Sequence, residues 1–148
     1  MPTPVVDAST GELLPAISEV IGNLLLNEGI GELLDLACGL GTPTAFSNAN
    51  AYIGVGDSVT AEAATQTDLQ AASNKTYKAM AASYPSRSAQ TVTWRAVFGS
   101  ADANYAWQEF TVVNASSGTG KNLNRKVSNQ GTKASGQTWT LDLAITLS

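Results

Sequence analysis

The strongest constraint on the fold is an alternation of apolar and polar residues near the C-terminal end of the chain, at residues 137–148. A period of two residues is typical of a β-strand with one buried face. The apolar members of this alternation are Trp139, Leu141, Leu143, Ile145 and Leu147. We predict that this strand pairs deep inside a sheet, because an apolar terminal strand would otherwise face water.

Five further segments have strand character, and turn residues separate them. They cover residues 48–56, 75–81, 90–98, 106–114 and 123–129. This pattern predicts a mainly β domain at residues 42–148, folded as an antiparallel β-sandwich or barrel of about six or more strands. The core residues that we predict are Trp94, Phe98, Trp139, Leu141, Leu143 and Ile145.

The N-terminal segment, residues 1–41, has a different pattern. Residues 1–9 contain two prolines and no periodicity, which predicts an extended arm. Apolar residues then recur at spacings of three and four, which predicts a helix that stops at Asn27-Glu28-Gly29, followed by a second short helix at residues 30–38. This helical hairpin carries surplus apolar surface, so we expect assembly contacts here. The expected interface residues are Val5, Val6, Leu13, Leu14, Ile17, Ile21, Leu24 and Leu25.

Charge is unevenly divided along the chain. Residues 1–70 hold nine acidic residues and no Lys or Arg, whereas residues 71–148 hold all eight basic residues and three acidic ones. The two halves either neutralise each other within one fold or attract neighbouring subunits in an assembly. The basic residues are too few and too scattered to track a phosphate backbone, and the acidic half would repel DNA. We therefore expect no nucleic-acid partner.

Neutral polar residues dominate the composition. Only 14% of the residues are charged, against about 25% in an ordinary globular protein, while Thr, Ser, Asn, Gly and Ala abound. Such a surface favours a large static assembly over a freely diffusing enzyme. The sequence has neither a signal-peptide pattern nor an apolar run of membrane-spanning length, so we expect a soluble protein without a membrane partner.

Residues suited to chemistry are scarce. Histidine is absent, and the single cysteine, Cys38, has no partner for an internal disulfide. The glycine pairs at residues 54–56 and 118–120 lack the other residues of nucleotide-binding motifs. The first pair therefore predicts tight backbone packing, and the second predicts a hairpin loop. We expect no enzymatic activity, no cofactor and no metal site. The carboxylates that sequence alone leaves open for glycoside hydrolysis are Asp57, Glu62, Asp102 and Glu109.

Seven segments follow one another from residue 48 onward: NANAYIGVGD (48–57), QTDLQ (66–70), TWRAVFG (93–99), ADANYAW (101–107), LNRKV (123–127), GTK (131–133) and TWTL (138–141). In this order they resemble a family of small β-rich structural proteins of tailed bacteriophages. The resemblance covers residues 48–148, and the N-terminal helical part is more variable. It implies a virion component, on the head surface or in the tail, and it carries no catalytic residues to this sequence.

We therefore expect a bacteriophage virion protein, most simply a capsid decoration protein that binds the major capsid protein and neighbouring copies of itself. We expect a trimer or another small ring, located in the virion and assembled in the host cytoplasm. The alternative is a tail, baseplate or fibre-associated protein with the same fold. A carbohydrate-binding β-sandwich is a remote third hypothesis, with Trp107 and Tyr105 as the residues that would stack on a sugar.

Overall fold

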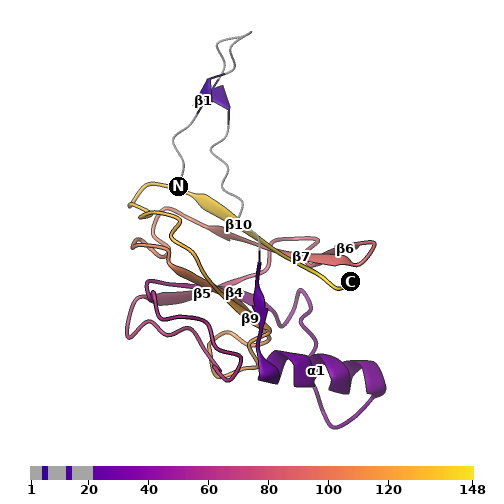
Figure 1. Cartoon of the computed structure of the whole chain (residues 1–148). Helices are drawn as coiled ribbons and strands as arrows, with labels where there is room; N and C mark the ends of the chain where they lie inside the picture. The colour runs from indigo at the N-terminus through magenta and orange to yellow at the C-terminus, as the bar shows by residue number, and fades with distance from the viewer. Residues whose placement is uncertain (1–4, 7–12, 15–21) are drawn as a thin grey trace.

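Two antiparallel sheets form the body of the protein in the computed structural model, which describes residues 5–6, 13–14 and 22–148. The five-stranded sheet has the order β3 (Leu24–Leu25), β9 (Asn124–Val127), β8 (Glu109–Val113), β4 (Tyr52–Gly56) and β5 (Lys75–Ala79). The three-stranded sheet has the order β10 (Trp139–Thr146), β7 (Thr91–Phe98) and β6 (Ser86–Ser88). The predicted mainly β fold, with its β-sandwich architecture, is confirmed (Figure 1).

Two smaller features complete the described chain. Strand β1 (Val5–Val6) pairs antiparallel with β2 (Leu13–Leu14). One α-helix, α1 (Asn27–Cys38), follows β3 and lies against one end of the body (Figure 1).

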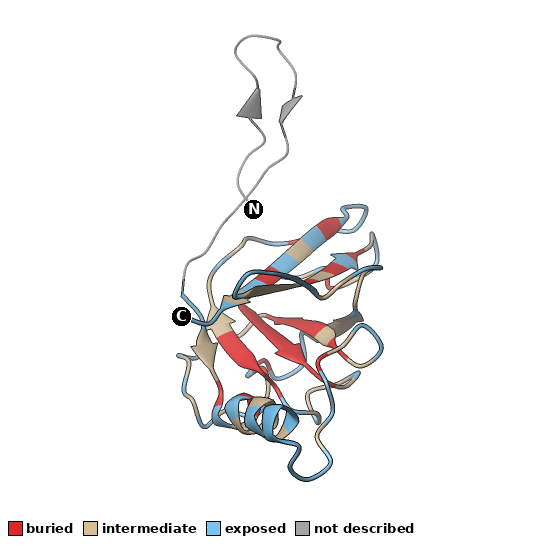
Figure 2. Ribbon diagram, turned by 90° about the vertical axis from the view of Figure 1, so that its right-hand side faces the viewer, coloured by how far each residue is buried: buried red, intermediate tan, exposed pale blue. Residues whose placement is uncertain are grey.

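The core lies between the two sheets, where the inward faces of their strands are buried (Figure 2). Trp107 stands at its centre, with ring centroids 4.8 Å from Phe98, 4.9 Å from Trp139 and 6.2 Å from Phe110, all in edge-to-face geometry. Such aromatic contacts add to the stabilisation that comes from burial alone. The structure buries Trp94, Phe98, Trp139 and Leu143 in this core and packs the half-buried Leu141 and Ile145 against it.

Strand β10 shows the predicted alternation but not the predicted position. It pairs with β7 over eight consecutive residues, from Trp139 opposite Phe98 to Thr146 opposite Thr91, and its residues alternate between buried or half-buried and exposed. However, β7 is the central strand and β10 lies at the margin of the sheet, so the prediction of a strand deep inside a sheet is wrong. The core buries Trp139 and Leu143 and half-buries Leu141 and Ile145, so most of the apolar side of β10 is covered without a second neighbouring strand.

The glycines of β4 are explained by their neighbours across the sheet. A Cβ on Gly54 would stand 2.8 Å from the Thr111 side chain, and a Cβ on Gly56 would stand 2.4 Å from a Glu109 carboxylate oxygen. These short distances confirm the predicted tight packing at this glycine pair. Strand β4 lies between β8 and β5, so it has a neighbouring strand on both edges. Two glycines here leave room for larger side chains on the adjacent strands.

The helical hairpin predicted for the N-terminal segment is wrong in its first half. Residues 13–14 and 24–25 belong to β2 and β3, and Gly22 has a φ of +91°, which a right-handed helix does not contain. The predicted second helix corresponds to α1, and Gly39 ends it in the left-handed conformation with φ +66°. Gly29, predicted as a helix stop, instead lies inside α1.

Residues 24–38, which we placed in a separate N-terminal segment, pack against the same core as residues 42–148. Leu26 is fully buried, and its backbone N–H donates to the carbonyl of Leu123 at 3.1 Å. Leu25 and Leu33 pack against the core cluster. A truncation intended to leave the body intact must therefore stop before β3.

Candidate functional site

Helix α1 is fixed to the body through one face. A Cβ on Gly29 would stand 2.5 Å from the Cα and the carbonyl oxygen of Leu123, so the helix approaches the sheet backbone closely at this point. The Glu28 carboxylate accepts hydrogen bonds from the backbone N–H and the side-chain amide of Asn122, at 2.6 and 3.1 Å. These contacts hold the helix in one orientation.

A second carboxylate, one turn further along α1, strengthens this attachment. Glu32 accepts hydrogen bonds from the backbone N–H of Thr44, at 2.7 Å, and from the side-chain amide of Asn114, at 3.1 Å. Asn114 is itself buried and also donates to the Thr44 carbonyl at 2.9 Å. The helix and the loop that follows it are therefore tied to the end of β8.

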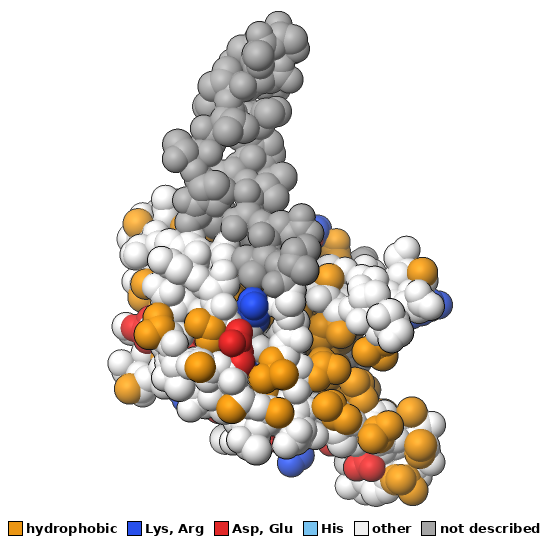
Figure 3. Space-filling model, viewed as in Figure 1, with side chains coloured by type: hydrophobic (Ala, Val, Ile, Leu, Met, Phe, Trp, Pro, Cys, Tyr) orange, Lys and Arg blue, Asp and Glu red, His pale blue; other side chains and the backbone are white. Residues whose placement is uncertain are grey.

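Helix α1 and the turn that follows it expose several large apolar side chains on both flanks of the face that packs on the body. We call this group the α1 patch, and it consists of Ile30, Leu34, Leu36 and Leu40. Leu34 and Leu40 are the most exposed of the four, with exposed fractions of 58% and 57%. Figure 3 shows apolar side chains gathered over α1. A fixed helix that presents leucines to solvent is a candidate contact surface for another protein.

The predicted interface residues have three different outcomes. Val5, Val6, Leu13 and Leu14 form β1 and β2, and their side chains lie outside what the structure describes. Ile17 and Ile21 fall outside the described residues altogether. Leu24 and Leu25 are half-buried in β3, where they pair with Arg125 and Asn124 of β9. The sequence predicted surplus apolar surface on this helical segment but did not name Ile30, Leu34, Leu36 or Leu40 among the interface residues, because periodicity alone does not show which side of the helix packs on the body.

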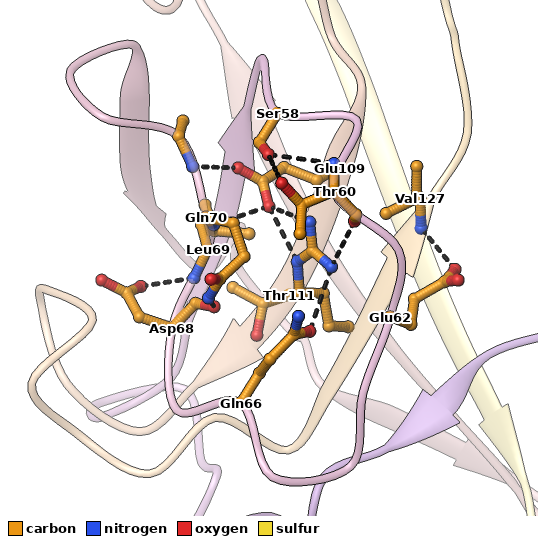
Figure 4. Close-up of polar contacts among 12 residues, drawn as sticks. Ser58, Thr60, Glu62, Gln66, Asp68, Leu69, Gln70, Glu109, Thr111 and Val127 are labelled. Carbon is orange, nitrogen blue, oxygen red and sulfur yellow. Dashed lines mark hydrogen bonds and ion pairs between the residues drawn. The ribbon is translucent and has the colours of Figure 1, made fainter.

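A fully buried ion pair lies on the opposite side of the five-stranded sheet from the core. Arg125 of β9 places Nε and Nη2 at 2.8 and 2.7 Å from the same oxygen of Glu109 on β8, and neither side chain is exposed to solvent. The backbone N–H groups of Gln70 and Ala71 donate to the two Glu109 oxygens, both at 2.8 Å. Figure 4 shows this arrangement.

The loop between β4 and β5, residues 57–74, is what covers this ion pair. Arg125 Nη1 donates to the Thr60 carbonyl at 2.9 Å and to the Gln66 side-chain oxygen at 3.0 Å, so the guanidinium binds the loop and the sheet together (Figure 4). A buried charge pair needs such additional hydrogen bonds to offset its lost hydration. The arrangement holds the loop down and leaves Glu109 no access to a substrate.

The other carboxylates that the sequence left open are also engaged within the chain. Glu62 accepts a 2.7 Å hydrogen bond from the backbone N–H of Val127, which holds the pKa of the Glu62 carboxyl below its ordinary value. Asp102 accepts 2.8 Å bonds from Lys78 Nζ and from the Gly99 backbone, and these bonds, the Lys78 bond first, lower the pKa of Asp102.

Asp57 likewise accepts a hydrogen bond within the chain, from the side-chain amide of Asn74 at 2.7 Å. The four carboxylates thus bind different parts of the fold. Their contacts place them in the attachment of loops and strands rather than in one shared site.

The aromatic residues proposed for sugar stacking do not form a sugar platform. Trp107 is 3% exposed at the centre of the core, so its ring faces cannot reach a ligand. Tyr105 is half-buried, and its hydroxyl donates to the Val55 carbonyl at 3.0 Å and contacts the Thr76 hydroxyl at 2.8 Å. Burial raises the pKa of Tyr105 to about 12. Both residues therefore belong to the packing of the sandwich.

The described residues lack two further features. No group of three or more metal-ligating side chains comes together in that part of the chain. No helix there has the length and apolar character needed to cross a membrane.

Comparison with known proteins identifies no relative of this chain. No protein-family model, no curated protein and no solved structure matches it. No relative therefore supplies a function, a site residue or a partner.

Proposed function

We propose that this protein is a structural component of a bacteriophage virion, and specifically a capsid decoration protein that binds the head surface and neighbouring copies of itself. The sequence pattern of residues 48–148 suggests the virion class. The observation that carries the binding role is the α1 patch, whose four large apolar side chains are 36% to 58% exposed on a helix, and on the turn that follows it, attached to the body by hydrogen bonds. A protein that uses this surface needs a macromolecular partner.

The distribution of charged side chains supports contacts between surfaces of opposite charge on neighbouring copies. Helix α1 contains Glu28, Glu32 and Asp35 and no basic residue. Arg87 stands exposed on β6, in the three-stranded sheet. Acidic and basic side chains on different elements of one subunit favour contacts between unlike surfaces of neighbouring copies, and head-to-tail contacts close into small rings when the rotation between copies permits. We accordingly propose a trimer or another small ring.

The buried Glu109–Arg125 pair stabilises the loop above it, which suits a protein that must stay folded in an assembled particle. A tail, baseplate or fibre-associated position would use the same surfaces. The number of copies in each particle separates these two locations.

An add-back experiment tests the role of the α1 patch. Particles from a phage whose gene for this chain is inactivated are mixed with the purified full-length protein and then sedimented. The parent protein should sediment with the particles, whereas Leu34→Asp should stay in the supernatant because a buried carboxylate at the contact is costly. Val59→Asp is the matched control, since Val59 is 71% exposed on the loop over the sheet. Equal binding by all three proteins would contradict the assignment of the patch.

A further inference from the structure

We propose that strand β10 is a second assembly surface, at which two copies of the chain join their three-stranded sheets by antiparallel pairing of β10 with β10. The four sheet margins of the sandwich differ in how they are protected. In the described part of the chain, no strand pairs with the second edge of β10. This pairing is independent of the α1 patch and adds a two-fold contact to the proposed ring.

The other three margins carry the features that block pairing between sheets. Strand β3 is two residues long, and β6 is three residues long and carries Arg87. Strand β5 carries Lys75 and Lys78 within five residues. Short strands and basic side chains are the usual protections of an exposed edge.

Strand β10 lacks these protections. It runs for eight residues without proline, glycine, lysine or arginine, and its register with β7 is unbroken by a bulge. Its one charged residue, Asp142, is held on the outer face by Arg95 through two 2.6 Å contacts. A long, regular and unprotected edge is a template for another strand.

The direction of the free hydrogen-bonding groups follows from the last pair of the ladder. The backbone N–H of Leu147 donates to the Gln90 carbonyl at 3.1 Å, so the odd-numbered residues of β10 direct their N–H and C=O groups toward β7. The even-numbered residues direct theirs to the open edge. These residues are Thr140, Asp142, Ala144 and Thr146.

One register between two copies pairs the free backbone groups of this edge, keeps its charges apart and brings its apolar side chains together. In this register the two-fold axis passes through Leu143, so Asp142 lies opposite Ala144 of the second copy and Thr140 lies opposite Thr146. The free backbone groups of the two strands can then bond to one another. No carboxylate lies directly opposite another carboxylate. On the inner face, the half-buried Leu141 comes opposite Ile145 of the second copy. Leu147, which is 58% exposed, comes opposite Trp139. The pairing would cover apolar surface that a single copy leaves in water.

Proline at position 144 tests the edge without breaking the sheet. The N–H of Ala144 points away from β7, so Ala144→Pro removes no bond of the β10–β7 ladder but blocks a neighbouring strand. Sedimentation velocity of the full-length protein should show that the largest species of Ala144→Pro contains half as many copies as that of the parent. Equal copy numbers would overturn the proposal, as would a parent protein that stays monomeric at all concentrations.

Charge at the same position tests the register and does not depend on the proline variant folding. Ala144→Lys places an ammonium opposite Asp142 of the second copy, twice in each dimer, and should tighten the two-fold contact by about 2- to 30-fold. Ala144→Glu places a like charge there and should weaken it by a similar factor. Within one copy the two substitutions have the opposite effects on folding stability, because position 144 lies diagonally from Arg95 in the β10–β7 ladder. Lysine is repelled by Arg95 there, and glutamate is attracted to it. Tightening by glutamate and weakening by lysine would overturn the proposed register.

Discussion

Removal of Arg125 should be among the most damaging single substitutions in this chain. Arg125→Met keeps much of the side-chain volume but leaves the Glu109 carboxylate buried without its counter-charge. Both side chains of the pair are fully buried, and two guanidinium nitrogens lie within 2.8 Å of one Glu109 oxygen. Breaking a buried pair in this way costs about 3–5 kcal/mol of unfolding free energy. For a chain of this length the melting temperature should fall by roughly 6–20 °C.

Urea unfolding at pH 7, followed by tryptophan fluorescence, measures this loss directly. Arg95→Met is the matched control, because the Arg95–Asp142 pair keeps side-chain exposures of 37% and 42%, and solvent screening leaves an exposed pair little effect on stability. The double substitution Glu109→Gln with Arg125→Met should recover part of the loss, since no buried charge remains. A cost for Arg125→Met no larger than that for Arg95→Met would refute the reasoning.

Three further predictions concern packing and pH. Gly29→Ala should lower the free energy of unfolding by about 1–3 kcal/mol, because its Cβ would stand 2.5 Å from sheet backbone. Gly31→Ala has open space around its Cβ and should raise the free energy of unfolding by about 0.5–1 kcal/mol in the same urea titration. Leu143→Ala should cost about 2–5 kcal/mol, and an unchanged melting temperature would show that the β10 assignment is wrong. The pKa values of Glu62 and Asp102 are lowered by folding, so their contribution is present at neutral pH and is lost as the pH falls below the ordinary values of 4.5 and 3.8. Thermal melts from pH 7 to pH 3 should therefore show a decline concentrated below about pH 4.5, which the double variant Glu62→Gln with Asp102→Asn reduces.

The strands with one buried face were predictable from sequence. In β7 and β10 the alternation is visible because one face packs on the core and the other meets solvent. Strand β8 shows no alternation because all five of its residues are buried. Phe110 and Val112 belong to the core cluster, while Glu109 on the other face lies under the loop of residues 57–74. Burial on both faces removes the period-two signal.

Other features depended on contacts that a linear pattern does not contain. The predicted strand at residues 106–114 included Trp107, but Trp107 precedes β8 and its side chain lies in the core. The apolar spacing of residues 13–25 matched a helix, yet Leu24 and Leu25 pair with β9 across a hundred residues of chain. Tertiary pairing outweighed helix propensity there. The ion pair of Arg125 and Glu109 likewise forms only when β8 and β9 come together.

The number of copies in each particle tests the proposed virion role most directly. Purified phage particles are digested, and peptides of this chain and of the major capsid protein are quantified by mass spectrometry against labelled standards. A capsid decoration protein should be present at hundreds of copies, in a fixed ratio to the major capsid protein. A handful to a few dozen copies would move the protein to the tail. Its absence from purified particles would contradict the proposal that it is a virion component.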